Sequence, residues 1–464
     1  MLPLVDSYKW MTGHSARRLG SGVAIVSIAM ELSAEDVASR PAAAERRPLK
    51  VGVLVDLTLA PEAGGHVKCW ERIAEAAVGC DDLDLTIHFN GPAPRRIELS
   101  PSVRYVLLPP VFSTARVVRR IPDHTDLARW HPRLAQALRG YDVIHTTDGF
   151  FCYARTAARF ARRHRVPLVS SIHTNTPEYA RITTDHLLER LLGRSFAYRV
   201  ATEALGVPYL VSGALQRQLH KHLRSVTVAL RNYGDDPAGA ADYPMSGFSL
   251  RRGLDRALFT PAKRDRAWTE ARFGIACNRT IVMYAGKLNQ GKNVPLLGRI
   301  MMRLRERGAA AHLLCAGAGD HRAALEAELG DAVTCAGSLS QPELARAYAS
   351  ADVFAFPSAI DEYANAAMEA LASGLPVLLA RGSGIAGRIA DCPAVTILPS
   401  DHAEPWAVAV AALAADPVHR LRLARAARAY AETRIPSWHQ VLTEDLLPVW
   451  RAAAAGLLSL PARQ

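Results

Sequence analysis

Two series of apolar, strand-like runs alternate with helical patterns along this chain, and this alternation constrains the fold more than any other feature. The first series opens with a continuous apolar run at residues 50–56, typical of a parallel strand covered on both faces, and closes near residues 226–230. The second series opens with the run Thr280–Ala285. Strands that alternate with helices predict parallel sheets, so we expect an α/β protein with two Rossmann-like domains.

The length of 464 residues agrees with this division, because single hydrophobic cores stop growing well below that size. Residues 232–249 are rich in Gly, Ala, Asp and Pro and lack periodicity, which indicates a linker or a surface insertion. We therefore expect an N-terminal extension at residues 1–48, a first domain at residues 49–231 and a second domain at residues 250–441.

The chain is basic, with 56 Lys and Arg against 44 Asp and Glu and a formal net charge of +12. Three groups of basic residues stand out, all in the N-terminal half, at 116–120, 159–165 and 217–224. These groups are either solvated helix faces or a surface for an anionic membrane. Neither zinc-finger spacing nor the aromatic and basic motif of a nucleic-acid reader is present, so we expect no nucleic-acid partner.

The seven cysteines are scattered, odd in number and without a Cys-x-x-Cys pair. This pattern favours a reducing cytosol and argues against a disulfide framework or a zinc site. The only early apolar run, at residues 23–30, is too short to span a bilayer. The sequence therefore predicts a cytoplasmic protein, and its basic N-terminal half leaves a peripheral position at the inner membrane face open.

The most informative stretch for chemistry runs from a strand that ends at residue 356 into a helix that begins near Asn365. The loop between them places Asp361 at the carboxyl end of a parallel strand, where open α/β sheets bind ligands. Glu369 follows eight residues later, within the helix, and can reach the same site. The backbone N–H groups that open the helix near Tyr363 and Ala364 suit a phosphate or a sugar hydroxyl.

Two further loops are informative, and each follows the first strand of one series. Lys287 and Lys292 lie five residues apart after a buried strand, where two cations can grip a diphosphate and stabilise the charge that develops on it. Gly64 and Gly65 precede a helical pattern and allow the backbone to approach phosphates at the positive end of that helix. His66 begins that helix.

The segment at residues 356–377 resembles the signature of glycosyltransferase family 4, in which two acidic residues stand eight positions apart. The resemblance implies that Asp361 contacts the transferred sugar and that Glu369 holds the nucleotide ribose. It also implies that Lys287 and Lys292 bind the donor diphosphate, at positions where the family has Arg and then Lys.

The stretch at residues 170–179 resembles a segment of family members that transfer mannosyl or sulfoquinovosyl groups to lipids. That resemblance implies that His173 hydrogen-bonds the sugar and helps to organise the reacting centre, whereas His145 is interpreted as structural. Residues 250–255 resemble the inter-domain segment of the family. The turns at residues 315–320 and 337–344 resemble those around the base-binding region, which implies donor contacts for Gly337 and Leu339.

The resemblance implies a GT-B fold with an inter-domain cleft and a C-terminal helix, 442–464, that crosses back to the first domain near Trp438. It implies a retaining, metal-independent hexosyl transfer from a UDP- or GDP-linked sugar to a hydroxyl of a lipid or glycan. No cofactor is implied beyond this co-substrate. The only Asp-x-Asp, at Asp82 and Asp84, opens an early strand, where a metal-dependent transferase does not need it.

Three positions depart from the family pattern and bear on the donor. Asp361 replaces the commoner Glu, Ala364 stands where Gly is usual, and Glu362 adds a neighbouring carboxylate. These departures keep a second function class open, a catalytically silent GT-B scaffold that binds a partner transferase. A GT-B sugar-nucleotide epimerase is a third alternative, and the paired acidic residues disfavour it.

Overall fold

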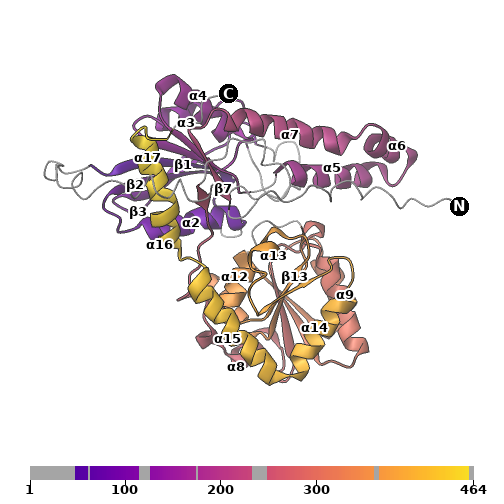
Figure 1. The fold of residues 1–464 in the computed structure, drawn as a ribbon. Helices are drawn as coiled ribbons and strands as arrows, with labels where there is room; N and C mark the ends of the chain where they lie inside the picture. Colours follow the sequence, from indigo (N-terminus) through magenta and orange to yellow (C-terminus); the bar gives the residue numbers. More distant parts are fainter. Residues whose placement is uncertain are drawn as a thin grey trace, which may run out of the picture. The chain divides into compact units, whose positions relative to one another are not determined.

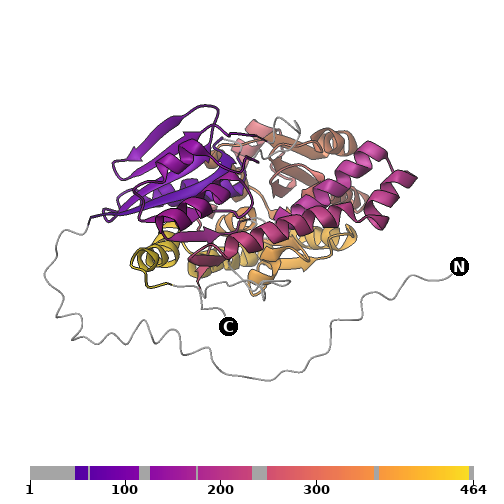
Figure 2. The ribbon, with the colours of Figure 1, turned by 90° about the horizontal axis from the view of Figure 1, so that it is seen from above.

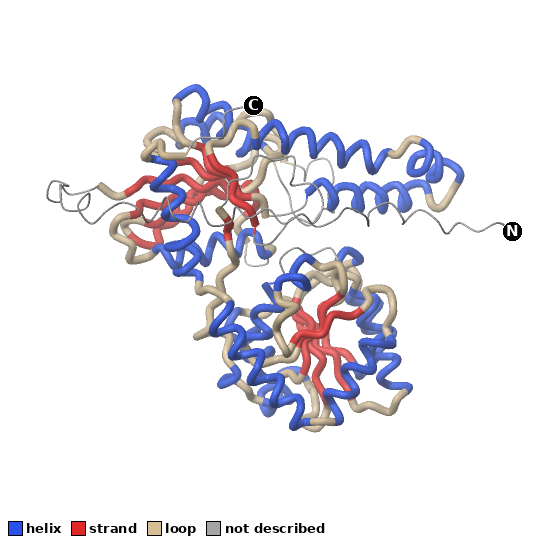
Figure 3. Tube along the Cα trace, viewed as in Figure 1, coloured by secondary structure: helices blue, strands red, loops and turns tan. Residues whose placement is uncertain are grey.

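The computed structural model of this chain describes residues 47–60, 63–113, 126–173, 176–232, 248–359 and 365–458. They form two α/β domains, each built around its own sheet, as the ribbon in Figure 1 shows. Helices flank the strands of both sheets, which are red in Figure 3. Nearly all of the predicted extension, most of the predicted linker, and Asp361, Glu362, Tyr363 and Ala364 of the predicted site lie outside the described residues.

The first sheet has eight strands in the order β3-β4-β2-β1-β5-β6-β7-β8, and all neighbours are parallel except β3 and β4. Its strands are β1 (Leu49–Thr58), β2 (Leu83–Asn90), β3 (Arg95–Ser100), β4 (Val103–Leu108), β5 (Val143–Thr146), β6 (Leu168–Ser171), β7 (Val228–Asn232) and β8 (Ser249–Leu250). Residues 51–56 of β1 are buried, which explains the continuous apolar run in the sequence.

The helices of the first domain are α2 (Gly65–Ala77), α3 (Pro132–Ala137), α4 (Cys152–His164), α5 (Thr176–Leu192), α6 (Phe196–Arg199) and α7 (Val207–Leu223). Helix α2 buries Trp70 and Ile73 against the strands of the sheet. Helix α4 is followed by its C-cap residue Arg165, which adopts the left-handed conformation with φ 56°.

The second sheet has six parallel strands in the order β11-β10-β9-β12-β13-β14. They are β9 (Thr280–Ala285), β10 (Ala311–Ala316), β11 (Val333–Gly337), β12 (Val353–Phe356), β13 (Val377–Ala380) and β14 (Val395–Leu398). Ala285 pairs with Ala316, and Ala316 pairs with Gly337, so the carboxyl ends of β9, β10 and β11 meet at one edge.

The helices around this sheet are α8 (Arg266–Phe273), α9 (Val294–Glu306), α10 (Arg322–Leu329), α11 (Gln341–Ser350), α12 (Asn365–Ala372), α13 (Gly384–Arg388), α14 (Glu404–Ala415) and α15 (Pro417–Arg434). Local sequence fixes several of their starts. Helix α11, for example, begins with a capping box in which Ser340 and Glu343 satisfy each other's backbone N–H groups.

The C-terminal segment returns to the core of the first domain. It comprises α16 (Trp438–Gln440), a π-helical turn (Val441–Leu446) and α17 (Leu447–Ala454). Trp450 is fully buried in the same apolar cluster as the strands of the first sheet. Arg251, which directly follows β8, donates to both carboxylate oxygens of Asp445 at 2.7–3.1 Å, so this segment is anchored by charge as well as by apolar packing.

Helix α3 begins directly after His131, which caps it, and Pro132 occupies its first turn. Two details of the first sheet were not predicted. The antiparallel edge strand β3 was not predicted. Strand β8 pairs with β7, so Ser249 and Leu250 extend the first sheet, although they lie at the predicted boundary between the linker and the second domain.

Candidate donor and acceptor sites

The two predicted phosphate-binding lysines lie on a tightly fixed loop after β9. The Tyr284 hydroxyl donates to the Lys287 carbonyl at 2.9 Å, and the Asn289 side chain accepts from the Lys292 N–H at 3.0 Å. Asn293 adopts the left-handed conformation, and its amide donates to the Ser400 carbonyl at 2.8 Å. Both lysine side chains are half-buried, so the loop presents two cations from a rigid backbone.

Glycines allow the neighbouring loops to touch this one at backbone distance. A Cβ atom on Gly317 would lie 2.0 Å from the Gly286 carbonyl oxygen, and a Cβ atom on Gly319 would lie 2.1 Å from that of Leu288. Gly317 also has φ 144°, and its N–H donates to the Gly337 carbonyl at 2.8 Å. These contacts join the loops after β9, β10 and β11 at the edge where open α/β sheets bind ligands.

Gly337 is thus connected through Gly317 to the loop of Lys287 and Lys292, which we call the lysine loop. Gly337 itself adopts the left-handed conformation, with φ 71°. Leu339, two residues on, is half-buried against the core of the second domain. The Asn293 amide also donates to the Pro357 carbonyl at 3.2 Å, at the end of β12. This contact ties the lysine loop to the segment that leads into residue 361, the first predicted acid.

The described part of the acidic segment begins with Asn365 at the start of α12. Asn365 and Glu369 lie four residues apart and so share one face of the helix. The Asn365 side-chain oxygen is buried and accepts no hydrogen bond from the described residues. A Cβ atom on Gly65 would lie 3.4 Å from the Asn365 amide nitrogen, which brings together predicted residues from both halves of the chain.

Glu369 has an unusual electrostatic setting. Burial raises the pKa of its carboxyl to about 7, whereas the Tyr348 hydroxyl and the positive charge of Arg72 lower it. The carboxyl is therefore poised between its neutral and charged forms near neutral pH. A ligand hydroxyl that donates to it stabilises the charged form, because hydrogen bonds to a carboxylate lower its pKa.

Gly64 and Gly65 stand at the N-terminus of α2 as predicted, but the backbone does not require glycine at the first of them. Gly64 has φ −67° and ψ 171°, which any residue adopts, and a Cβ atom there would meet no atom of the described residues within 4 Å. Among the described residues, no side chain caps this helix. Glycine therefore keeps the space before the first-turn N–H groups open, as an anion-binding helix end needs.

His173 lies in a network of buried rings and donors at the end of β6. Its Nε2 atom is 2.8 Å from the Ser171 hydroxyl, and its Nδ1 atom accepts from the Arg252 guanidinium at 2.8 Å. His145 reaches the same hydroxyl through Nε2 at 2.9 Å and accepts from the Trp450 indole through Nδ1 at 3.0 Å. Two histidines thus converge on one serine.

The donors fix the tautomers in this network. The Trp450 indole and the Arg252 guanidinium can only donate, so Nδ1 of each histidine is an acceptor. Each neutral ring therefore carries its proton on Nε2, and Ser171 accepts from both. Burial, followed by the Arg252 charge, holds the pKa of His173 well below its usual range. His173 is neutral at physiological pH, and both of its nitrogens are engaged.

Sequence reasoning missed two members of this site. His66 stacks on His173 with ring centroids 4.5 Å apart, and its Nε2 atom is buried without a hydrogen-bond partner among the described residues. Burial and then the Arg252 charge lower the pKa of His66 to about 3. The helix-opening position of His66 gave no sign of this stacking, and Arg252 lies 79 residues from His173.

Comparison with known proteins identifies both halves of the chain. The family model described as glycosyltransferase family 4 matches residues 64–236, and the model described as glycosyl transferases group 1 matches residues 279–416. A D-inositol 3-phosphate glycosyltransferase from Pseudarthrobacter chlorophenolicus is 30% identical over 301 residues, which cover 63% of this chain and 67% of that protein. The chain belongs to glycosyltransferase family 4. It is a glycosyltransferase enzyme, as the sequence predicted.

Other relatives and several solved structures also resemble this glycosyltransferase. A sulfoquinovosyl transferase from Arabidopsis thaliana is 27% identical over 265 residues, covering 56% of this chain and 45% of that protein. Among solved structures, sucrose-phosphate synthase from Thermosynechococcus elongatus has a TM-score of 0.62 at 19% identity, covering 89% of this chain and all of the other. HepE from Anabaena, crystallised with UDP-glucose, has a TM-score of 0.58 at 14% identity, covering 88% and 99%. These likenesses confirm the predicted GT-B fold.

The Asp-x-Asp of this glycosyltransferase has a structural setting. Asp84 pairs with Arg104 on the neighbouring strand, and Asp82 pairs with Arg451 of α17. Within the described ranges, no group of three His, Cys, Asp or Glu side chains is placed to hold a metal ion. The two aspartates therefore tie β2 to its neighbours.

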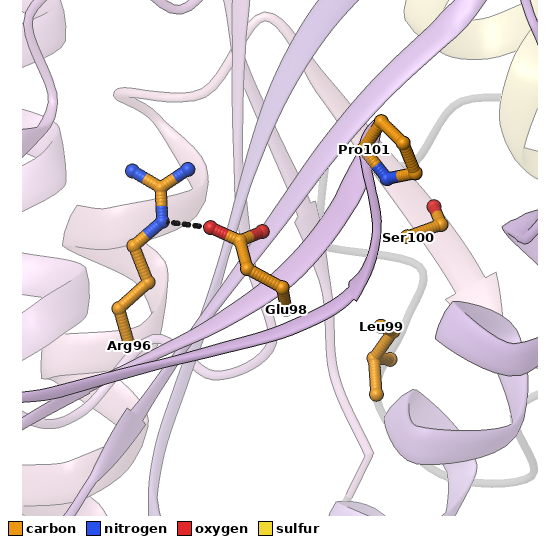
Figure 4. A pocket seen from close by; sticks show the side chains of 5 residues that line it. All are labelled: Arg96, Glu98, Leu99, Ser100 and Pro101. Atoms are coloured by element: carbon orange, nitrogen blue, oxygen red, sulfur yellow. Dashed lines mark hydrogen bonds and ion pairs between the residues drawn. The ribbon is translucent and has the colours of Figure 1, made fainter.

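Figure 4 shows a depression at the β3–β4 edge of the first sheet, lined by Arg96, Glu98, Leu99, Ser100 and Pro101, in which Arg96 pairs with Glu98. None of the predicted donor or acceptor residues that the structure describes lines it. No helix of the described chain is both long and apolar enough to cross a membrane.

Proposed function

We propose that this glycosyltransferase moves a hexosyl group from a nucleotide-diphosphate sugar to a hydroxyl of a lipid or glycan, with retention of configuration and without a metal ion. The observation that carries the proposal is the lysine loop, held by Tyr284, Asn289 and Asn293 at the edge of the second sheet. Two cations fixed there stabilise the negative charge that builds up on a departing diphosphate.

In this proposal the donor occupies the second domain. Lys287 and Lys292 bind the diphosphate, and Glu369 accepts from the ribose hydroxyls. The turn at Gly337 and Leu339 contacts the base. Asn365, whose side-chain oxygen accepts no hydrogen bond from the described residues, binds the donor as well in this proposal. In this proposal the transferred sugar is bound by Asp361, Tyr363 and Ala364.

A UDP-linked donor is one of two options, the other being GDP. The structure of HepE, a fold relative, was solved with UDP-glucose, which supports UDP as the first donor to test. The reaction needs no cofactor beyond the sugar nucleotide in this proposal.

The chemical step balances within the bound pair. The bond between the anomeric carbon and the diphosphate oxygen breaks, and the bond between that carbon and the acceptor oxygen forms on the same face. The acceptor's proton passes to the departing diphosphate oxygen. Negative charge therefore develops on the diphosphate, where the two lysines lie, and the lysines take the place of a metal cation.

His173 has a positioning role in the proposal. Because both of its ring nitrogens are already engaged, a sugar hydroxyl that binds there exchanges with Ser171 or Arg252. Gly64 and Gly65 leave room before α2 for phosphate or acceptor oxygens. The resemblance of residues 170–179 to lipid-directed transferases and the sulfoquinovosyl relative support a lipid acceptor.

We also propose that the enzyme lies in the cytoplasm, at an anionic membrane face, because all seven cysteines are free and the first domain is rich in basic groups.

The proposed donor site is tested by thermal-shift titration with UDP, GDP and their hexose conjugates in the presence of chelator. A ligand that binds only the native state raises its stability by mass action. A shift with one nucleotide family that disappears in Lys292→Ala but persists in Lys263→Ala supports the site. No shift with any nucleotide refutes the proposed donor site.

A further inference from the structure

The helices α5, α6 and α7 form a hairpin that extends from the first sheet, as the magenta segments of Figures 1 and 2 show in two directions. Helices α5 and α7 pack mainly on each other, and the inner part of α7 meets α4. Gly193 and Gly206, both in the left-handed conformation, bound the short connection between the two long helices. The outer half of the hairpin therefore has few neighbouring elements of the first domain against which its side chains could be buried.

Large apolar side chains are nevertheless concentrated there. Of the 19 exposed large hydrophobic residues in the described chain, eight lie between residues 187 and 211. Five of them, which we call the apolar tip, are at least 61% exposed: Leu191 (70%), Phe196 (75%), Leu205 (61%), Tyr209 (65%) and Leu210 (64%). Exposed apolar groups gathered in one place mark an interaction surface, because isolated soluble proteins rarely expose such patches.

Basic residues accompany the apolar tip. Arg190, Arg194 and Arg199 are exposed on the same part of the hairpin. Further along α7, a shallow depression is lined by Arg217, His220, Lys221 and Arg224. Residues 176–224 contain seven Arg or Lys against four Asp or Glu. The hairpin thus combines an apolar end with a surplus of positive charge.

This combination distinguishes between two occupants. A second copy of the chain, packed tip to tip, would bring like charges together around the apolar contact. A bilayer with anionic lipids accepts both features, because apolar and aromatic side chains enter the interface while long basic side chains reach the lipid phosphates. Each Lys or Arg near such a surface adds to the attraction, and the charge balance of the hairpin has the required sign.

We infer that the apolar tip inserts into the interfacial layer of an anionic phospholipid bilayer, with the surrounding arginines on lipid phosphates. This inference rests on the lipid-directed part of the proposed function and names the surface that serves it. It assigns to the hairpin a role apart from donor binding, since none of its residues belongs to the proposed donor site.

The first test is flotation of the full-length protein with vesicles of phosphatidylcholine, with and without phosphatidylglycerol. We expect binding to the anionic vesicles and a loss of affinity of about tenfold or more when Phe196→Ser and Leu210→Ser are combined. The matched control combines Val418→Ser and Leu421→Ser, which remove exposed apolar groups from α15 (80% and 53% exposed) and should leave vesicle binding unchanged.

The second test changes charge only. Arg190→Glu with Arg199→Glu should weaken binding to anionic vesicles, and added salt should weaken the wild-type protein in the same way, because salt screens exposed charges. Arg425→Glu, on α15, is the control. Vesicle binding that is equal in the wild-type and tip variants overturns the inference. So does a wild-type dimer, seen by sedimentation, that the tip variant loses.

Thermal-shift titration with sugar nucleotides, without vesicles, separates this inference from the proposed function. Tip variants should keep the wild-type nucleotide response. A protein that binds vesicles through the tip but responds to no nucleotide retains the docking surface and contradicts the proposed reaction. The opposite result, a nucleotide response without any vesicle binding, retains the reaction and removes the docking surface.

Discussion

Glu369→Gln should change the pH dependence of stability in a way that the structure specifies. Burial raises the pKa of Glu369 in the folded protein to about 7, above its ordinary value of 4.5. Between these two values the native state binds more protons than the unfolded state, so stability falls as pH rises through this window. Glutamine has nearly the same shape and does not titrate, so the variant lacks this loss.

The magnitude follows from the width of the window. Between about pH 5 and pH 8, the ionisation of Glu369 should cost the folded protein about 2–3 kcal/mol relative to the glutamine variant. A domain of this size shifts its melting temperature by about 2–4 °C per kcal/mol. The difference in melting temperature between the variant and the wild type should therefore change by about 5–10 °C across this pH range. Tyr348→Phe should enlarge the effect in the wild-type background, because the Tyr348 hydroxyl lowers the pKa of Glu369.

The assay is thermal unfolding of wild-type and variant protein across this pH range, with Glu328→Gln on an exposed face of α10 as the control. Comparing the variant with the wild type removes the contributions of other titrating groups, such as Asp56, whose pKa burial raises to about 8. Parallel pH profiles for wild type and Glu369→Gln would refute the reasoning, since they would show that this carboxyl keeps its ordinary pKa.

The remaining predictions concern the loops and the histidine network. Gly317→Ala should unfold at clearly lower denaturant concentration, because its Cβ atom would lie 2.0 Å from a backbone oxygen. Gly308→Ala should cost only about 1 kcal/mol of stability, since no atom of the described residues lies within 4 Å of the added Cβ atom. Arg252→Met should raise the pKa of His173, measured by NMR, because the Arg252 charge lowers it; an unchanged value contradicts the assigned contact. Gly64→Ala should leave the melting temperature unchanged but weaken nucleotide-sugar binding, and undiminished binding removes this glycine from the site.

The second domain was the more predictable of the two, and its strands show why. The runs at Thr280–Ala285 and Val353–Phe356 coincide with β9 and β12, because buried parallel strands carry uninterrupted apolar sequence. Such elements are specified locally and need no knowledge of their neighbours.

The parts that sequence reasoning missed depend on distant or unusual contacts. The contact of Arg252 with His173 joins residues far apart in the chain. Arg251 and Arg252 are adjacent, and the sequence does not indicate which of them contacts the histidine. The hairpin of α5 and α7 carries apolar residues around its surface and not along one buried stripe, so its pattern does not reveal how it packs. The short edge strand β3 lacks a buried apolar run, because four of its six residues are exposed.

The proposed function requires that the loop of Lys287 and Lys292 binds the diphosphate of a sugar nucleotide without a metal ion. Calorimetric titration of the wild-type protein with UDP- and GDP-hexoses in excess chelator tests it most directly, with Lys292→Ala and Lys263→Ala measured alongside. We expect binding of one donor in chelator, a loss of affinity of about tenfold or more in Lys292→Ala and no change in Lys263→Ala. Binding that requires a divalent cation, or that is equal in all three proteins, would contradict it.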